Sequence, residues 1–328
     1  MSHPLAQVAD PIPFRKLLDE AVKQTRRTIK PLYLWILLPA LLFQVPMVLM
    51  QGFQFQLAES QAPSPAALGA ILGGCGLMMI ALPIYWFCSV AVALAAADGV
   101  AGRSVAPGQR LRTALHPRTW LTLILVMILI FALPTLLFFA AVVLAAVGAA
   151  ASPVVAGVAM LGAMALALLS LVFFATRFAF VLPVMAEEGT AGFTAIGRTF
   201  KLISTNPARR FVDNTVTKVF VVGLVFYTLN AALALPLQLP FSAGFLLTVI
   251  RAVLEGVNPN AAMAEGAAPW MMGLATLVGT FGQAAAQLYF FNALSLLYFD
   301  VRRRREAPDL VEALAEVERG GSRGAEPA

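Results

Sequence analysis

The sequence has little charge, little cysteine and little histidine, and each scarcity makes one class of protein a poor fit. Only 12% of its 328 residues are charged, whereas soluble domains usually carry about 25%. The two cysteines, Cys75 and Cys88, lie in one apolar stretch, so we expect packing residues rather than a disulfide or a metal pair. The two histidines, His3 and His116, offer little material for acid–base chemistry, and we expect His116 to be a solvated loop residue.

Familiar catalytic motifs are missing as well. The sequence contains no HExxH, GxSxG or glycine-rich phosphate-binding pattern. We therefore predict that the protein is not an enzyme, and we assign it no catalytic residue, no cofactor and no metal ligand.

Long apolar runs are what the sequence has in abundance. Hydrophobic residues make up 60% of the chain, and its mean hydropathy is +0.82. Because backbone amides in hydrocarbon need internal partners, such runs predict helices. Six runs exceed the roughly 18 residues that indicate a membrane span: 31–50, 66–97, 119–147, 153–184, 215–250 and 269–299. The sequence thus predicts an all-α integral membrane protein with six transmembrane helices arranged as three hairpins.

The basic residues orient these six spans. Of 23 lysines and arginines, only Arg251 is expected to face outward, and four consecutive arginines, 302–305, follow the last span. Cytoplasmic loops carry an excess of such residues, so we predict a bacterial inner-membrane protein with both termini in the cytoplasm. The net charge of +6 then reflects topology, and no nucleic acid is expected as a partner.

A similar segment precedes each predicted hairpin. Residues 14–27, 107–120 and 193–210 place apolar side chains at helical spacing among basic ones. We interpret them as cytoplasmic amphipathic helices that lie on anionic lipid headgroups, although any short loop between spans could look alike. The predicted domains are an N-terminal segment (1–30), the six-helix membrane domain (31–300) and a basic, then flexible, tail (301–328).

Several polar residues fall inside or at the ends of the spans. Arg177 is costly there unless it snorkels or pairs, and Asp98, Glu187 and Asp300 lie at corresponding inner ends, where they could form an acidic ring. Arg177 and the ring could hold a lipid headgroup or gate a pathway. We favour a structural interpretation, in which Arg177 pairs with one of the acids, Glu188 included.

Amides and glycines give a second set of candidates. Spans five and six contain four amide side chains: Asn230, Gln283, Gln287 and Asn292. Pro236 and Pro240 interrupt span five, a feature of transport sites, but hydrogen bonds between helices are the commoner explanation. Gly69 and Gly73 are spaced as in helix-packing motifs.

Two stretches resemble a known family. The first has Pro183, an acid at 187 or 188, Gly189, Ala195, Arg198 and Leu202, and the second has Tyr298, Asp300, Arg302, Glu306, Asp309 and Leu310. Together they resemble the membrane domain associated with bacterial glycerophosphoryl diester phosphodiesterases. The hydrolytic work of that family belongs to a separate soluble barrel, for which this chain has no room.

The function predicted from the sequence is therefore non-enzymatic. We expect a scaffold or an accessory subunit in envelope or lipid-related processes, with membrane lipids and an unknown protein as partners. The alternative is a transporter or lipid-translocating protein that uses the cleft between hairpins.

Overall fold

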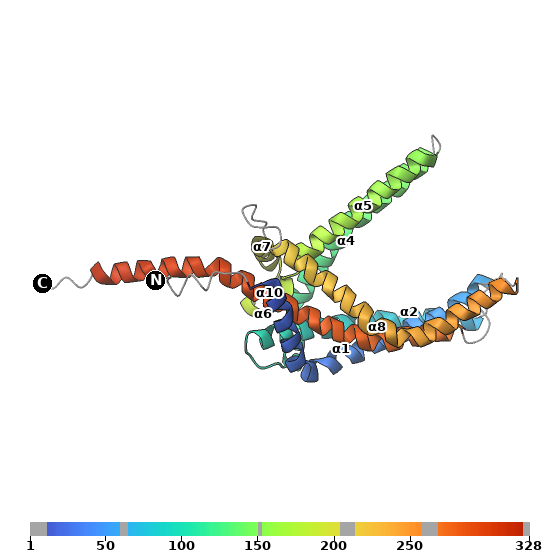
Figure 1. Ribbon diagram of the computed structural model, residues 1–328, viewed down its shortest axis with the longest axis horizontal. Helices are drawn as coiled ribbons and strands as arrows, with labels where there is room; N and C mark the ends of the chain where they lie inside the picture. The colour runs from blue at the N-terminus through green and yellow to red at the C-terminus, as the bar shows by residue number, and fades with distance from the viewer. Residues whose placement is uncertain (1–11, 60–64, 150–152, 204–213, 257–267, 324–328) are drawn as a thin grey trace. The chain divides into compact units, whose positions relative to one another are not determined.

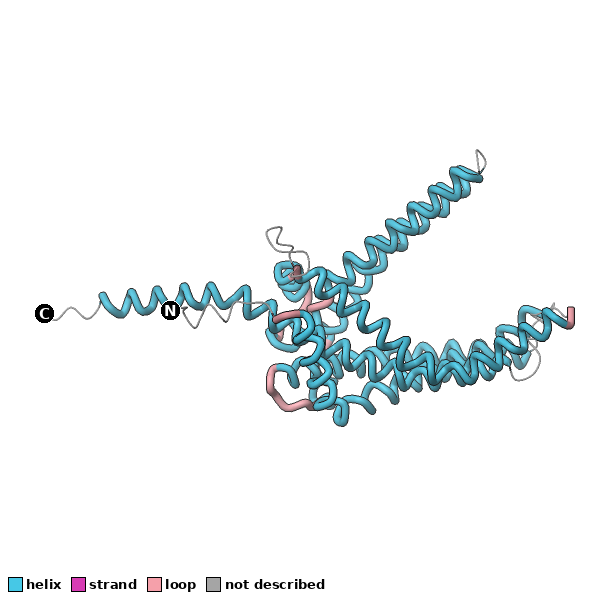
Figure 2. Tube along the Cα trace, in the orientation of Figure 1, coloured by secondary structure: helices cyan, strands magenta, loops and turns pink. Residues whose placement is uncertain are grey.

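A computed structural model describes residues 12–59, 65–149, 153–203, 214–256 and 268–323, and every regular element in them is a helix (Figures 1 and 2). The long helices are α1 (Phe14–Glu59), α2 (Pro65–Val100), α4 (Pro117–Ala149), α5 (Pro153–Phe178), α8 (Thr215–Leu254) and α10 (Ala268–Arg323). The short ones are α3 (Pro107–Ala114), α6 (Val181–Glu188) and α7 (Phe193–Leu202). The all-α prediction is confirmed.

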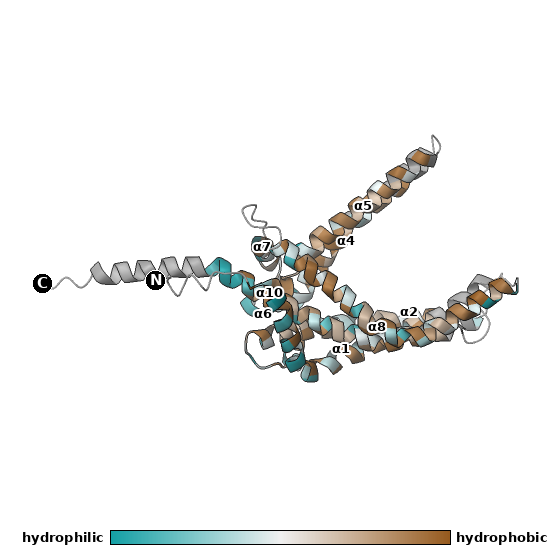
Figure 3. Cartoon of the chain, in the orientation of Figure 1, coloured by the Kyte–Doolittle hydropathy of each residue, from teal (hydrophilic) through white to brown (hydrophobic). Residues whose placement is uncertain are grey.

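Five helical segments of the described chain are long and apolar enough to cross a membrane. They are Phe14–Met50, Ile71–Val100, Pro117–Ala140, Met160–Glu188 and Thr215–Leu254, and Figure 3 shows apolar residues along much of their length. These five match the first five predicted spans, as expected of a multi-pass membrane protein. The predicted sixth span lies in α10, where Gln283, Gln287 and Asn292 dilute the apolar run.

The chain forms two compact units, and each is described by itself. One unit comprises residues 22–115 and 223–292. Its core includes Leu32 and Ile36 of α1, Val92 of α2 and Leu288 of α10, all fully buried. The alanines of α2 between positions 91 and 97 are buried. Because their side chains are small, the neighbouring helices can approach α2 closely.

The second unit comprises residues 1–21, 116–222 and 293–328. It contains the α4–α5 hairpin, the short helices α6 and α7, and the later part of α10. Phe180, immediately before α6, packs edge-to-face on Tyr298 of α10 with ring centroids 5.9 Å apart, and both side chains are fully buried. Gly189 ends α6 in the left-handed conformation (φ 62°), which glycine adopts without steric cost, and the chain then turns into α7.

The predicted amphipathic segments are helical, but two of them have bounds that the sequence did not predict. The first continues through Pro31 into the apolar part of α1, and the second ends at Ala114 because His116 precedes Pro117, which starts α4. Positions 204–210 of the third lie outside the described residues. Leu17 and Ala21 in the first segment are 1% and 0% exposed, so part of its apolar face packs inside the protein, whereas Val22 is 42% exposed. That these helices lie on lipid stays a prediction.

Two local predictions about the helices are wrong. Helix α8 runs through Pro236 and Pro240, since each proline removes only one backbone hydrogen bond and such prolines are tolerated in membrane helices. A side chain at Gly69 or Gly73 would meet nothing within 4 Å, whereas one at the neighbouring Gly74 would meet Met50 at 2.7 Å. The packing face of α2 therefore lies one position away from the predicted one.

The cysteines differ from the prediction in one respect. Both are free thiols, and Cys88 is half-buried, but Cys75 is exposed and so is not a packing residue. It directly follows Gly74 and lies about 100° further around α2 from the packed position.

Candidate functional site

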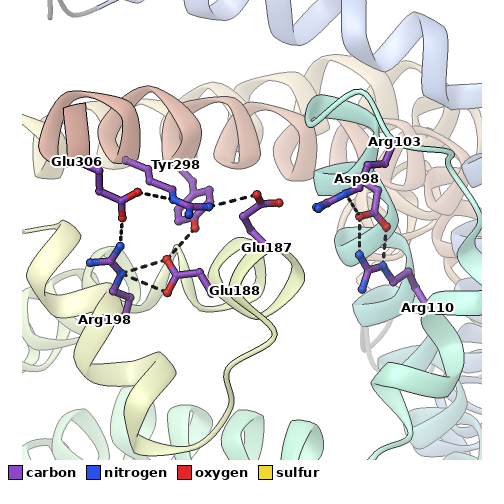
Figure 4. Close-up of polar contacts among 9 residues, drawn as sticks. Asp98, Arg103, Arg110, Glu187, Glu188, Arg198, Tyr298 and Glu306 are labelled. Atoms are coloured by element: carbon purple, nitrogen blue, oxygen red, sulfur yellow. Dashed lines mark hydrogen bonds and ion pairs between the residues drawn. The ribbon is translucent and has the colours of Figure 1, made fainter. Parts of the chain in front are cut away.

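The most extensive polar cluster of the described chain joins α6, α7 and α10 (Figure 4). We call it the ionic network and define it by six residues: Glu187, Glu188, Arg198, Tyr298, Arg302 and Glu306. They come from the two sequence stretches that carry the family resemblance. Three carboxylates and two guanidinium groups give the network one excess negative charge.

Arg198 of α7 is the centre of the network. Its Nε donates to both carboxylate oxygens of Glu188, at 3.0 and 3.2 Å, and its Nη2 donates to Glu306 of α10. The turn at Gly189 makes this geometry possible, because it returns α7 towards the end of α6. One arginine thus ties the end of α6 to a helix more than a hundred positions later in the chain.

Arg302 and Tyr298 extend the network along α10. Arg302 Nε donates to Glu306 at 2.8 Å, and its Nη1 lies 3.2 Å from Glu187. The Tyr298 hydroxyl donates to Glu188 at 3.1 Å. All four carboxylate and guanidinium partners of these contacts are partly exposed, so solvent screening limits what each single pair contributes.

A second ion pair lies deeper on α10. Arg304 donates to Asp300 at 2.6 Å, and the two side chains are only 3% and 4% exposed. The backbone N–H of Ile12 also donates to Asp300, at 3.2 Å, while Lys218 of α8 donates to the carbonyl of Ile12 at 3.1 Å. Burial makes this pair costly to break on one side, since the remaining charge would have no partner.

Asp98 has arginine partners in its own unit. It ends the buried part of α2 and accepts hydrogen bonds from Arg103, at 2.9 Å, and from Arg110 of α3, at 2.5 Å. These residues, with Ser104 and Gln109, line a small polar pocket of about 190 Å³. Asp98, Glu187 and Asp300 are thus each held by separate arginines, and the acidic ring stays a prediction.

Arg177 does not form the predicted ion pair within the described chain. Its Nη1 donates to the carbonyl of Ile203 at 2.6 Å, and its guanidinium stacks on Phe173 and Phe200, 5.2 and 5.9 Å from the ring centroids. The reason is local: Ile203 follows the last turn of α7, where carbonyl groups lack helical partners and attract a cation. Arg177 therefore caps α7 from α5.

The four candidate amides divide into two pairs. Gln287 accepts a hydrogen bond from Tyr85 of α2 at 3.1 Å, and Asn292 donates to Thr25 and Thr28 of α1, which supports their interpretation as links between helices. Asn230 has a buried side-chain oxygen without a hydrogen-bond partner in the described chain, and Gln283 is half-buried. For these two, the sequence interpretation stays a prediction.

An apolar groove of about 850 Å³ lies on the second unit. Side chains of α4, α5 and the first two turns of α8 line it, among them Leu137, Leu169, Phe173, Thr217 and Phe220. No residue of the groove was a candidate from the sequence, because apolar side chains in a span carry no signal that separates a groove from a packed face.

The arginines of the ion pairs were also missed as site residues. Arg302 and Glu306, and Asp300 and Arg304, are spaced i, i+4 on one helix, the spacing at which side chains meet. That signal was present in the sequence. The sequence held no comparable signal for the pairing of Arg198 with Glu306, since that pairing depends on the turn at Gly189.

His116 lies at the start of α4, where its side chain is exposed and its Nδ1 accepts the N–H of Arg118 at 3.3 Å. Its carbonyl accepts the N–H of Thr119, so the residue serves the helix start. Within the described residues, no group of three or more His, Cys, Asp or Glu side chains could hold a metal ion.

Comparison with protein-family models, with curated proteins and with solved structures finds no match to this chain. The resemblance to the phosphodiesterase-associated membrane domain thus stays a prediction from the two sequence stretches.

Proposed function

We propose that the protein is a non-enzymatic membrane scaffold or accessory subunit in envelope or lipid-related processes, of the phosphodiesterase-associated membrane-domain type. In this proposal α10 supplies a sixth span, the spans form three hairpins, and both termini lie in the cytoplasm of a bacterium. The basic amphipathic segments contact anionic lipid headgroups.

The continuation of α10 carries this proposal. The helix does not end with the apolar run at Phe299 but continues through the four arginines to Arg323. Its last part has apolar residues at helical spacing, Leu310, Leu314 and Val317, between acidic ones such as Glu312 and Glu316. An acidic helix is repelled by an anionic lipid surface, so its apolar stripe suits a groove on a protein partner.

The ionic network supports the same function. Glu306 accepts from both Arg198 and Arg302 directly before this extension. The network therefore holds the base of the extension to α6 and α7, as a scaffold requires. Its charged groups are engaged with each other rather than arranged around a bound substrate.

The test uses the full chain and two truncations. The protein is extracted from its native membrane in a lipid-retaining copolymer, and bound proteins and lipids are identified by mass spectrometry. We expect a soluble protein in stoichiometric amount that is lost on truncation after Glu306 and kept on truncation after Arg323. Equal recovery of the same proteins from both truncations would contradict the scaffold.

The groove favours a second candidate function, lipid translocation. Its apolar lining suits an acyl chain, and helices α4, α5 and α8 that form it are candidate spans. Transfer of a fluorescent phospholipid between leaflets of proteoliposomes, together with no stoichiometric protein partner, would favour this candidate over the scaffold.

A further inference from the structure

The lining of the apolar groove offers almost no free hydrogen-bonding group. Two of its hydroxyl groups form hydrogen bonds within their own helix. Ser170 donates to the carbonyl of Ala167 and Thr176 to that of Phe173, both at 2.8 Å. A polar solute would lose its hydration without gaining partners. The chemistry of the wall therefore selects hydrocarbon.

The groove has the length of one lipid leaflet. Along α5 it extends from Leu166 to Thr176, or about 15 Å at 1.5 Å per residue, half of the roughly 30 Å hydrocarbon core. Leu169 and Phe173 are 65% and 48% exposed, so the groove is open on its outer side. On a membrane-spanning hairpin that side faces acyl chains.

Arg177 lies at the end of the groove nearest the end of α5. Its guanidinium stacks on Phe173, which lines the groove, and donates to Ile203. A guanidinium carries five N–H donors, and that hydrogen bond uses one of them. Arginine is the side chain best suited to phosphate oxygens, which it binds through two parallel hydrogen bonds.

We propose that the groove is a phospholipid site, in which one acyl chain lies along α5 and α8 and the lipid phosphate binds Arg177. Packing of an acyl chain alone would give the groove little preference for one lipid over another, because bulk lipid tails are as apolar as the groove. Selection comes from the charge-assisted hydrogen bonds to phosphate. This site does not depend on which of the two candidate functions is correct. A lipid that supports a scaffold and a lipid that is translocated would both bind in the same groove.

The test measures lipid retained by the full chain. Purified protein is stripped of lipid in detergent, titrated with phosphatidylglycerol, and examined by native mass spectrometry. We expect one lipid that survives washing with wild-type protein and with Leu168→Trp, a control on the exposed face of α5 outside the groove. Leu169→Trp, which fills the groove, should reduce retention about tenfold. Equal retention by the two tryptophan variants would overturn the site.

The phosphate contact has its own probe. Diacylglycerol with the same acyl chains lacks the phosphate, so wild-type protein should retain it about tenfold less than phosphatidylglycerol. Arg177→Gln should remove that preference. Because this variant could also loosen α7, the comparison of the two lipids on wild-type protein decides: equal retention of both would show that Arg177 holds no phosphate.

Discussion

Charged side chains of this protein link its helices through ion pairs and hydrogen bonds. Some of these contacts could be predicted from the sequence and others could not. The i, i+4 spacing of Asp300 and Arg304 was readable on a predicted helix, because helix geometry alone brings such side chains together. The capping of α7 by Arg177 was not readable, since it depends on where the chain returns after Gly189. Local pairs follow from periodicity, whereas long-range pairs follow from the turn between elements.

At this scale the buried pair gives the sharpest prediction. Asp300→Asn leaves Arg304 without its charge partner and should cost about 3–5 kcal/mol of stability, the usual loss when one side of a buried pair is removed. Adding Arg304→Met should recover part of that loss. The measurement is the midpoint of thermal unfolding in detergent for the wild type, both single variants and the double variant.

Two controls accompany this cycle. Arg177→Leu combined with Asp300→Asn should show additive losses, because the two residues share no contact in the structure. Arg251→Ala removes an exposed pair with Glu255 and should leave the midpoint unchanged. Additive losses for Asp300→Asn and Arg304→Met would refute the coupling.

The helices themselves were mostly predictable. Apolar runs located the long helices, but the helices extend beyond the runs, because a helix continues through polar residues and prolines when its backbone stays hydrogen-bonded. Contacts between helices were less predictable. Gly282 illustrates this, since a side chain there would lie 2.7 Å from the backbone of Leu233, where α10 packs against α8.

We therefore expect Gly282→Ala to lower stability by about 1–3 kcal/mol, the usual cost of overpacking against atoms that cannot move aside. Gly76→Ala is the matched control: its new methyl group would meet nothing within 4 Å, and alanine favours a helix by up to about 1 kcal/mol. Thermal unfolding of both variants in the same detergent measures the difference. Equal midpoints would mean that α8 and α10 are not in close contact at this point.

For the whole molecule, the number of spans decides the topology. Within the described part of the chain, five helical segments meet the requirements of a span, and the sixth depends on α10. With six spans the two termini lie on the same side of the membrane, and with five they lie on opposite sides. Composition predicted the class of protein, but the glutamines of α10 bring its apolar run close to the lower limit for a span.

Reporter fusions test the six-span arrangement. Fusions after Ala328 and in the loop between α2 and α3 should report the cytoplasm, and fusions near Glu59 or Asn260 the periplasm, because basic residues concentrate on the cytoplasmic side. Asn260 lies outside the described residues. A periplasmic C-terminus together with a cytoplasmic α2–α3 loop would leave only five spans.

The contact between Ile12 and Asp300 has a consequence for biosynthesis. These residues are 288 positions apart, so a ribosome that adds about 5–20 residues per second finishes the second one tens of seconds after the first. Lys218 donates to the carbonyl of Ile12, so its partner is already made when Lys218 emerges. The backbone N–H of Ile12 must therefore wait for the Asp300 carboxylate, and the last helix to be made completes this contact.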